Sequence, residues 1–333
     1  MKSSIVHVLL TGGIGSRLWP LSRKSQPKQY LELFNGESLF EKTIIRNRNF
    51  ADRLLVVGNV DNCHLSKNIL ENKNIAYVNI VESTPRNTAA AIAFAAFAVD
   101  SEDVLLVTPS DHIIENEEAY EVALKEAIDK AEQGYIVTFG VQPTKPETGY
   151  GYIEFKNDTV LSFREKPNAV TAKQFIATGN FLWNSGMFCF KAGVFLEELQ
   201  KYQPDVYEKA KLVWDNNKEG NLDLDLSLNI PSISVDYAVM ERSKKIKVVP
   251  AAFEWSDLGS FESVYDYLLS TGEIVDANGN MTIGCGLPTH FLGLKNVIFV
   301  HTPTANLILQ KEHSQDVKDI YNQLEKEESK LLD

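Results

Sequence analysis

Hydrophobic residues in the first 140 positions fall in short blocks, and stretches with a helical pattern of polar and apolar residues separate them. The apolar blocks are residues 5–10, 54–58, 76–81, 104–111 and 135–140. The intervening helical stretches lie near residues 39–48, 62–71, 87–99 and 116–133. Short β-branched blocks that alternate with helices of this length are typical of a largely parallel sheet with helices on both faces. The first half of the chain therefore predicts a doubly wound α/β domain.

This alternation ends near residue 141, where loops rich in Gly, Pro, Asn and aromatic residues begin. Two more helices are predicted near 193–214 and 235–243. The segment STGEIVDANGNM has the composition of a linker, so we place a domain boundary there and predict domains at 1–272 and 273–333. The tail has two short β-type runs, NVIFV and NLILQ, followed by a charged helix.

Composition excludes several classes of protein. The 333 residues are 44% hydrophobic and 23% charged, as in an ordinary globular protein. No apolar run reaches the roughly 18 residues that span a bilayer, and no secretion signal is visible, so we expect a cytoplasmic protein without membrane contact. The three cysteines form no CxxC pair that would indicate a disulfide framework or a zinc site. A net charge of −12 argues against a nucleic-acid-binding surface.

One basic, glycine-rich stretch stands out in this acidic chain: GGIGSRLWPLSRKSQPK, residues 12–28. It directly follows the first predicted strand, at the sheet edge where open α/β sheets bind ligands. Glycines there let backbone N–H groups approach an anion closely. The stretch lacks the GKS or GKT of a Walker A motif, and Leu18 stands where a dinucleotide fingerprint has its third glycine. We interpret it as a phosphate-binding loop; the alternative is a solvated turn whose basic residues have no function.

The same stretch resembles the signature of sugar-1-phosphate nucleotidyltransferases, GGxGxRLxPLx5PK. The matching residues are Gly12, Gly13, Gly15, Arg17, Leu18, Pro20, Leu21, Pro27 and Lys28. Trp19 and the sequence KQY that begins at Lys28 are similar to the bacterial mannose-1-phosphate guanylyltransferases. Further segments resemble that group in the same order: residues 82–96, 108–114, 138–153, 165–167, 181–188, 234–242 and 255–261.

The resemblance implies a Rossmann-like, doubly wound mixed sheet, with a small C-terminal left-handed β-helix-like domain that makes a homodimer contact. It implies transfer of GMP from GTP to α-D-mannose 1-phosphate, which gives GDP-mannose and pyrophosphate. Many bacterial relatives continue into an isomerase domain. Because this chain ends at Asp333, we expect no isomerase activity.

This reaction needs positive charge rather than a general base, because the attacking phosphate oxygen is already an anion. Mg²⁺ takes one or two carboxylates together with phosphates and water. Asp111 ends the run VLLVTPSD, which predicts a carboxylate at the strand end. A single Asp after a strand is more often a helix cap or a surface turn, and only its pairing with the glycine-rich loop favours a metal ligand here. The resemblance implies Asp257 as the second metal ligand and Arg17, Lys28 and Lys166 as catalytic cations.

The resemblance also implies two sets of binding residues. The nucleotide residues are Leu10, Thr11, Gly12, Gly13, Gly15, Ser16, Arg17, Lys28, Arg86, Asn87, Ser110 and Asp111. The sugar-phosphate residues are Glu147, Thr148, Gly149, Tyr150, Glu165, Lys166, Asn184, Ser185 and Gly186. Asn87 and Thr88 are equally typical of a cap on the Ala-rich helix. Family members often carry Ala at positions 11 and 110, so the choice of nucleobase stays open.

Two alternatives to this function remain. One is the same chemistry with another sugar 1-phosphate or another nucleoside triphosphate. The other is a catalytically silent nucleotide-sugar sensor on the same fold. A sensor would not need both metal carboxylates and the cations, so the presence of Arg17, Lys28, Asp111, Lys166 and Asp257 together favours an enzyme.

Overall fold

The computed structural model describes residues 3–32 and 36–333 and divides into two compact units. The first, here called the sheet unit, comprises Met1–Gly12, Thr43–Ser110 and Ile114–Trp255. The second, the loop unit, comprises Gly13–Lys42, Asp111–Ile113 and Ser256–Asp333. This division follows spatial proximity, and the domain boundary at 272/273 stays a prediction.

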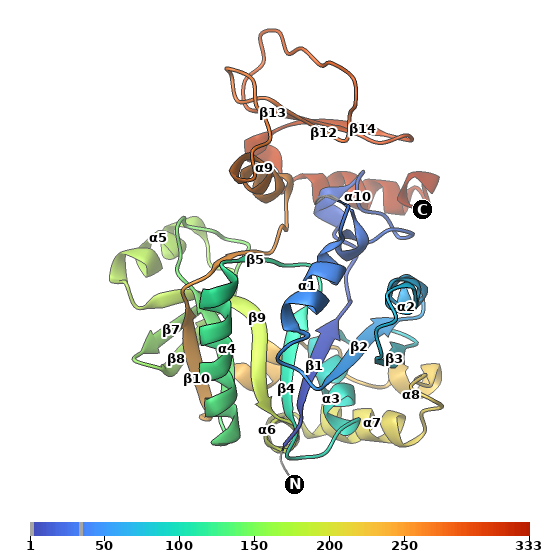
Figure 1. Cartoon of the computed structure of the whole chain (residues 1–333), viewed down its shortest axis with the longest axis vertical. Coiled ribbons are helices and arrows are strands. Elements are labelled where there is room, and N and C mark those ends of the chain that lie inside the picture. The colour runs from blue at the N-terminus through green and yellow to red at the C-terminus, as the bar shows by residue number, and fades with distance from the viewer. Residues whose placement is uncertain (1–2, 33–35) are drawn as a thin grey trace. The chain divides into compact units, whose positions relative to one another are not determined.

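A mixed β-sheet forms the centre of the sheet unit (Figure 1). Among the described residues its strand order is β3-β2-β1-β4-β9-β6-β10-β8-β7. The strands are β1 (Ile5–Leu10), β2 (Arg53–Asn59), β3 (Val78–Glu82), β4 (Val104–Pro109), β6 (Ile136–Val141), β7 (Tyr152–Lys156), β8 (Thr159–Arg164), β9 (Phe181–Lys191) and β10 (Ile246–Ala251). Strand β1 pairs in parallel with β2 and β4, whereas β9 runs antiparallel between β4 and β6. The predicted α/β class with a mixed sheet is therefore confirmed.

Helices cover both faces of this sheet (Figure 1). Because successive strand residues point to opposite faces, Leu105 and Val107 of β4 share a buried core with one set of helices, while Val104 and Leu106 share another with the opposite set. The first set is α3 (Asn87–Phe97), α6 (Ala192–Tyr202) and α7 (Pro204–Asp215). On the opposite face lies α4 (Glu117–Glu132). This two-sided cover is the doubly wound arrangement that the alternating blocks predict.

Most predicted helices are present, with two differences. The predicted helix at 193–214 is two helices, α6 and α7, because Pro204 has no N–H to continue the first and is well suited to begin the second. The predicted helix at 235–243 is a short π-helix, η3 (Asp236–Met240). Four further helices are α1 (Leu39–Asn47), α2 (Cys63–Asn72), α5 (Ala169–Thr178) and α8 (Leu224–Leu228). None of the described helices is both long enough and apolar enough to span a bilayer.

The loop unit contains a small sheet and two helices that pack on the segment after the glycine-rich turn. Strand β13 (Val297–His301) pairs in parallel with β12 (Met281–Ile283) and antiparallel with β14 (Asn306–Gln310). Its core joins Leu18 and Trp19 to residues of α9 (Phe261–Ser270) and α10 (Val317–Lys326). This sheet agrees with the predicted strands NVIFV and NLILQ, whereas a left-handed β-helix stays a prediction. Short strands β5 (Ile113–Glu115) and β11 (Glu254–Ser256) pair separately.

A buried histidine in β1 predicts acid sensitivity. His7 is 2% exposed, and its Nε2 lies 2.8 Å from Thr108 Oγ1. Burial, together with the nearby Arg46 guanidinium, lowers the pKa of His7 to about 3. Below about pH 6.5 the unfolded chain therefore binds a proton at His7 that the folded chain does not bind. The free energy of unfolding falls by up to ~1.4 kcal/mol per pH unit through this group as pH falls from about 6.5 towards 3.

We expect His7→Gln, whose amide can still bond Thr108, to lose less stability on acidification than the parent. Urea unfolding at pH 7.5, 6 and 5 measures the difference. Equal pH dependence in both proteins would contradict this account of His7.

Candidate functional site

The glycine-rich turn packs closely against the side chain of Lys28. Gly13 and Gly15 have φ values of +94° and +78°, which favour glycine. A Cβ atom on Gly15 would lie 2.5 Å from Lys28 Cβ, so no other residue fits at position 15 without a shift of the chain. The Lys28 backbone N–H donates to the Ile14 carbonyl oxygen at 3.1 Å. The loop is therefore folded around the lysine that the signature places at its end.

Lys28 joins both predicted metal carboxylate residues. Its side chain is almost fully buried, and Nζ lies 2.8 Å from Asp111 Oδ2. The same ammonium donates to the backbone carbonyl oxygen of Asp257. Asp111 and Asp257, from two other stretches of the loop unit, thus both contact the Lys28 ammonium, and the roles that the resemblance implies for these three residues stay predictions.

The charge of Asp111 is set by this cation. Burial alone raises the pKa of the carboxyl group, but the ammonium of Lys28 and the neighbouring His112 outweigh it, so the pKa of Asp111 is lower than usual. His112 Nε2 lies 3.6 Å from Asp111 Oδ1. The Asp111 side chain stays 29% exposed. It is therefore an ionised carboxylate within reach of a ligand, and it does not cap a helix.

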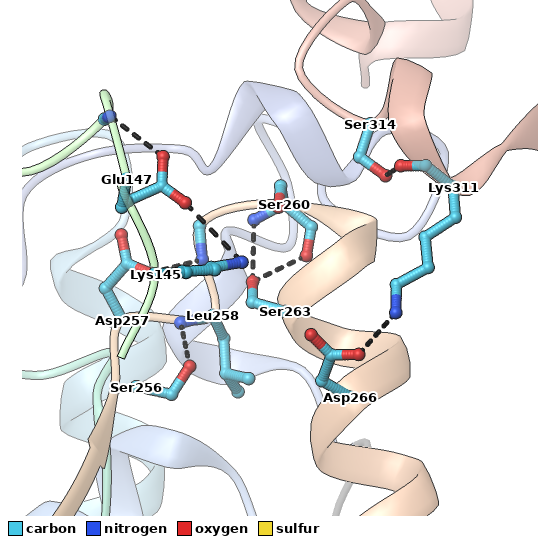
Figure 2. A network of polar contacts seen from close by, with 12 residues as sticks. Lys145, Glu147, Ser256, Asp257, Leu258, Ser260, Ser263, Asp266, Lys311 and Ser314 are labelled. Atoms are coloured by element: carbon cyan, nitrogen blue, oxygen red, sulfur yellow. Dashed lines mark hydrogen bonds and ion pairs between the residues drawn. The ribbon is translucent and has the colours of Figure 1, made fainter. Parts of the chain in front are cut away.

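Asp257 lies in a tight turn that fixes its carboxylate (Figure 2). Its Oδ1 accepts the Gly259 N–H at 2.9 Å, and a Cβ on Gly259 would lie 2.5 Å from Oδ2. Leu258 has a φ of +43°, and its N–H donates to Ser256 Oγ at 3.1 Å. The side chains of Ser260 and Ser263 then cap α9 reciprocally. The backbone around Asp257 is thus determined by short local hydrogen bonds.

Asp111 and Asp257 suit a magnesium ion better than a metal that requires an all-protein cage. Mg²⁺ is bound through one or two carboxylates and completes its octahedron with phosphate oxygens and water. In the described ranges no group of three or more His, Cys, Asp or Glu side chains could hold a metal together. Asp111 and Asp257 both contact Lys28, one through its carboxylate and the other through its backbone, and Mg²⁺ binding by their carboxylates stays a prediction.

Arg17 provides a second cation in the same unit. It lies in the 3-10 turn η1 (Ser16–Leu18) and is half-buried. Within residues 3–32 and 36–333, its guanidinium has no hydrogen-bond or ion-pair partner. Arginine forms two parallel hydrogen bonds with phosphate readily, so Arg17 is available for an anionic ligand.

The nucleotide residues of the sheet unit lie at the carboxyl ends of its strands. Both the N–H and the hydroxyl of Thr11 bond the Val57 carbonyl oxygen, at 2.9 and 3.1 Å, so this side chain belongs to the sheet. Ser110 N–H donates to the Leu10 carbonyl oxygen at 3.1 Å. A Cβ on Gly12 would meet nothing within 4 Å, which leaves the backbone there open to a ligand.

Arg86 and Asn87 begin α3 without capping it by their side chains. Arg86 Nε donates to the Ile230 carbonyl oxygen at 2.7 Å. Asn87 has a φ of +70°, and its Oδ1 accepts the N–H of Thr88 at 2.8 Å. Thr88 Oγ1 accepts the Val235 N–H. The alternative of ordinary helix capping is therefore not what these residues do, and their contact with a nucleotide stays a prediction.

Three of the predicted sugar-phosphate residues lie together in the sheet unit. A Cβ on Gly151 would lie 2.6 Å from Glu165 Oε2 and 3.5 Å from Asn184 Cβ, so glycine permits this approach. Lys166 Nζ lies 3.1 Å from Glu165 Oε1, and its side chain is 61% exposed. Asn184 Nδ2 donates to Asp236 Oδ1 at 2.8 Å.

Asp236 is a polar residue of this group that the sequence analysis did not single out. Burial raises the pKa of its carboxyl group, against the hydrogen bond from Asn184. It begins the π-helix η3, an irregularity that is frequent at functional sites. The available signal was the segment SVDYAVMER, which contains Asp236 and is part of the family resemblance.

The remaining predicted sugar residues differ in exposure and partners. Glu147 Oε1 accepts the Gly149 N–H at 2.9 Å, and Oε2 lies 3.6 Å from Lys145 Nζ (Figure 2). The Tyr150 ring packs edge-on against Trp183 and Trp255. A further hydroxyl, that of Ser185, is buried and donates to the Phe139 carbonyl oxygen. Thr148 lies in the same loop as Glu147, whereas Gly186 lies in β9, and sugar contacts for this set stay predictions.

Comparison with known proteins decides the family. The family described as Nucleotidyl transferase matches residues 6–273, most of the chain. The chain belongs to the nucleotidyl transferase family. Alginate biosynthesis protein AlgA of Pseudomonas aeruginosa is 38% identical over 352 residues, which cover 96% of this chain and 72% of AlgA. Mannose-1-phosphate guanylyltransferase of Escherichia coli K12 is also 38% identical, over 97% of this chain and 74% of its own length.

A solved structure has a similar fold over nearly the whole chain. The structure named mannose-1-phosphate geranyltransferase, from Thermus thermophilus, has a TM-score of 0.83 and 28% identity, and it covers 97% of this chain and 99% of its own. The resemblance inferred from the glycine-rich signature is therefore confirmed at the level of family. The match also extends across both compact units rather than the signature alone.

Proposed function

We propose that this protein transfers the GMP group of GTP to α-D-mannose 1-phosphate and releases pyrophosphate. The observation that carries the proposal is the buried Lys28 ammonium, which binds Asp111 and the Asp257 backbone beside the glycine-rich turn. Two relatives at 38% identity support the substrates, since one is named mannose-1-phosphate guanylyltransferase and the other is the biosynthetic protein AlgA.

The chemistry requires stabilisation of charge. An oxygen of the sugar phosphate attacks the α-phosphorus of GTP, and the bond from that phosphorus to the bridging oxygen of the β-phosphate breaks. The electron pair leaves with pyrophosphate, and no proton has to move. Lys28 and Arg17 stabilise the negative charge that develops in the transition state. Electrostatic stabilisation of this kind dominates the catalysis of phosphoryl-type transfer. We assign Lys166 to the phosphate of the sugar, and Glu165 and Asn184 to its hydroxyl groups.

Asp111 and Asp257 would hold the Mg²⁺ ion. When bound, the ion neutralises charge on the triphosphate oxygens. The contribution of the chain itself is to keep Asp111 ionised through Lys28 and to fix Asp257 in its turn. The homodimer and the cytoplasmic location stay predictions.

A substrate panel tests the proposed function. Purified protein with Mg²⁺ is given each of four nucleoside triphosphates with several hexose 1-phosphates, and pyrophosphate release is measured. We expect release with GTP and mannose 1-phosphate. Release with a different pair would support the alternative specificity, and no release with any pair would support the silent sensor.

A further inference from the structure

The side-chain amide of Asn184 is held by protein groups at both of its ends. Its Oδ1 accepts the backbone N–H of Gly186 at 3.1 Å and the hydroxyl of Thr138 at 3.4 Å. Its Nδ2 donates to Asp236 Oδ1 at 2.8 Å, and within residues 3–32 and 36–333 this nitrogen bonds no other acceptor. An amide has one oxygen with two lone pairs and one nitrogen with two hydrogen atoms. The protein therefore uses both lone pairs of the oxygen, and one N–H remains for a ligand.

The backbone of Asn184 is fixed, so its amide can change only by turning over. Asn184 lies in β9, where its N–H donates to the Gly151 carbonyl oxygen at 2.8 Å and the residue pairs with Gly140 of β6. Rotation about the last side-chain torsion exchanges the oxygen and the nitrogen at little intrinsic cost, because such torsions are roughly two-fold. The hydrogen-bond partners therefore decide which atom of the amide faces which neighbour.

Asp236 is the side chain that decides this orientation. The hydroxyl of Thr138 can accept as well as donate, so it fits either position of the amide, whereas a carboxylate only accepts. If the amide of Asn184 turned over, its oxygen would face the Asp236 carboxylate, and two acceptors would meet. Burial raises the pKa of the Asp236 carboxyl group, and the hydrogen bond from Asn184 opposes this by favouring the carboxylate. The two side chains thus stabilise each other in the observed arrangement.

Glu165 lies next to Asn184 and provides the complementary chemistry. A Cβ atom on Gly151 would lie 2.6 Å from Glu165 Oε2 and 3.5 Å from Asn184 Cβ, so both side chains flank this glycine. The Glu165 side chain is 26% exposed, and its Oε1 lies 3.1 Å from Lys166 Nζ. A sugar hydroxyl group both donates and accepts hydrogen bonds. A carboxylate acceptor beside an amide N–H donor therefore matches a hydroxyl group in both respects.

We infer that Asp236 is a positioning residue for the sugar: it holds the Asn184 amide so that Asn184 donates to a hydroxyl oxygen of the sugar 1-phosphate and does not accept from it. This inference rests on the proposed function, which assigns Glu165 and Asn184 to the hydroxyl groups. Asp236 acts through Asn184 and needs no contact of its own with the substrate. Its removal should therefore weaken sugar binding and leave GTP binding as it is.

Asp236→Ala tests this role through a difference between the two substrates. We expect KM for mannose 1-phosphate to rise at least about tenfold, because the Asn184 amide is then free to present its oxygen to the hydroxyl group. KM for GTP should stay within about twofold of the parent value, since only binding of the sugar is lost. Initial rates of pyrophosphate release measure both values, and thermal unfolding shows whether the variant is folded.

Two further variants separate the position of the acceptor from its charge, and they do not depend on the folding of Asp236→Ala. Asp236→Asn keeps a carbonyl oxygen at the same distance without the charge, so KM for mannose 1-phosphate should stay within about threefold of the parent value. Asp236→Glu keeps the charge but adds a methylene group that displaces the acceptor, so this KM should rise. The opposite order, with Asp236→Glu nearly normal and Asp236→Asn impaired, would overturn the positioning role.

Analogues of mannose 1-phosphate that each lack one hydroxyl group test the contact itself. In the parent, at least one analogue should lose about tenfold or more in kcat/KM, because the Asn184 N–H and the Glu165 carboxylate are left without their partner. In Asp236→Ala the same analogue should lose about threefold or less, since two changes that remove one interaction are not additive. Equal losses in the parent and in the variant would contradict the inference.

Asp158→Ala is the matched control. It removes another hydrogen-bonded carboxylate of the sheet unit, which accepts from Lys130 and Lys247 at 2.8 Å each, and it should leave KM for both substrates unchanged. An active parent with an unchanged KM for mannose 1-phosphate in Asp236→Ala would overturn the role of Asp236 and leave the proposed function intact. An equal rise in KM for both substrates would do the same, because it indicates a purely structural residue. A parent that uses another sugar 1-phosphate but not mannose 1-phosphate would overturn the proposed function and this inference together.

Discussion

The Lys28→Met protein is expected to turn over GTP and mannose 1-phosphate at least about a hundredfold more slowly than the parent, as expected when a preorganised charge contact to the transition state is lost. Methionine replaces the apolar stem of lysine without its ammonium, so the Gly15 turn can still pack against it. The loss should appear in kcat as well as kcat/KM, because Lys28 opposes charge that develops during the reaction. Pyrophosphate release under saturating substrates measures it.

Lys24→Met is the control for this experiment. Lys24 is a cation of the same loop, but its side chain is 48% exposed and its ammonium lies 3.9 Å from Glu325. We expect nearly normal turnover, since an exposed ion pair contributes little. Circular dichroism of both variants separates a loss of fold from a loss of chemistry. A folded Lys28→Met protein with nearly normal kcat would remove the role assigned to Lys28.

The second large effect is expected from Asp111→Asn, which removes a metal-binding charge without a change in size. Turnover should fall at least about a hundredfold, and the Mg²⁺ concentration that gives half-maximal rate should rise. The Mg²⁺ requirement should rise because Asp257 alone would offer the ion one negatively charged carboxylate instead of two. Rates measured across a Mg²⁺ titration at fixed GTP test both expectations.

Asp266→Asn is the matched control for Asp111→Asn. Asp266 also accepts from a lysine, Lys311, but its side chain is 50% exposed and lies on α9 (Figure 2). Its removal should leave the Mg²⁺ dependence unchanged. If Asp111→Asn had the Mg²⁺ dependence of the parent, Asp111 would not be a metal ligand.

The sequence predicts the sheet and its helices well because the signals are local. Apolar blocks and helical periodicity can be recognised within about ten or fifteen residues. The boundary between α6 and α7 was missed, because the helical periodicity continues across Pro204, the residue that ends one helix and begins the next. The family resemblance likewise places Lys28, Asp111 and Asp257 in one site, and the structure brings them together.

Other features of the site depend on contacts that no local pattern records. Asn184 donates to Asp236 across 52 positions. Glu82, at the end of β3, is buried, and its Oε1 has no hydrogen-bond partner among the residues that the structure describes. A glutamate at the end of a strand is otherwise typical of an exposed residue. For this reason the sequence analysis did not single out either carboxylate as a site residue.

The contact between Lys28 and the Asp257 carbonyl spans 229 positions of the chain. During synthesis on the ribosome, the lysine emerges long before its second anchor has been translated, and contacts so distant in sequence form late in folding. A nascent chain halted before residue 257 would therefore contain the glycine-rich turn and Asp111, but Lys28 would lack the carbonyl oxygen of Asp257 as its second partner. Such truncated products would be unable to consume nucleotide in the cell.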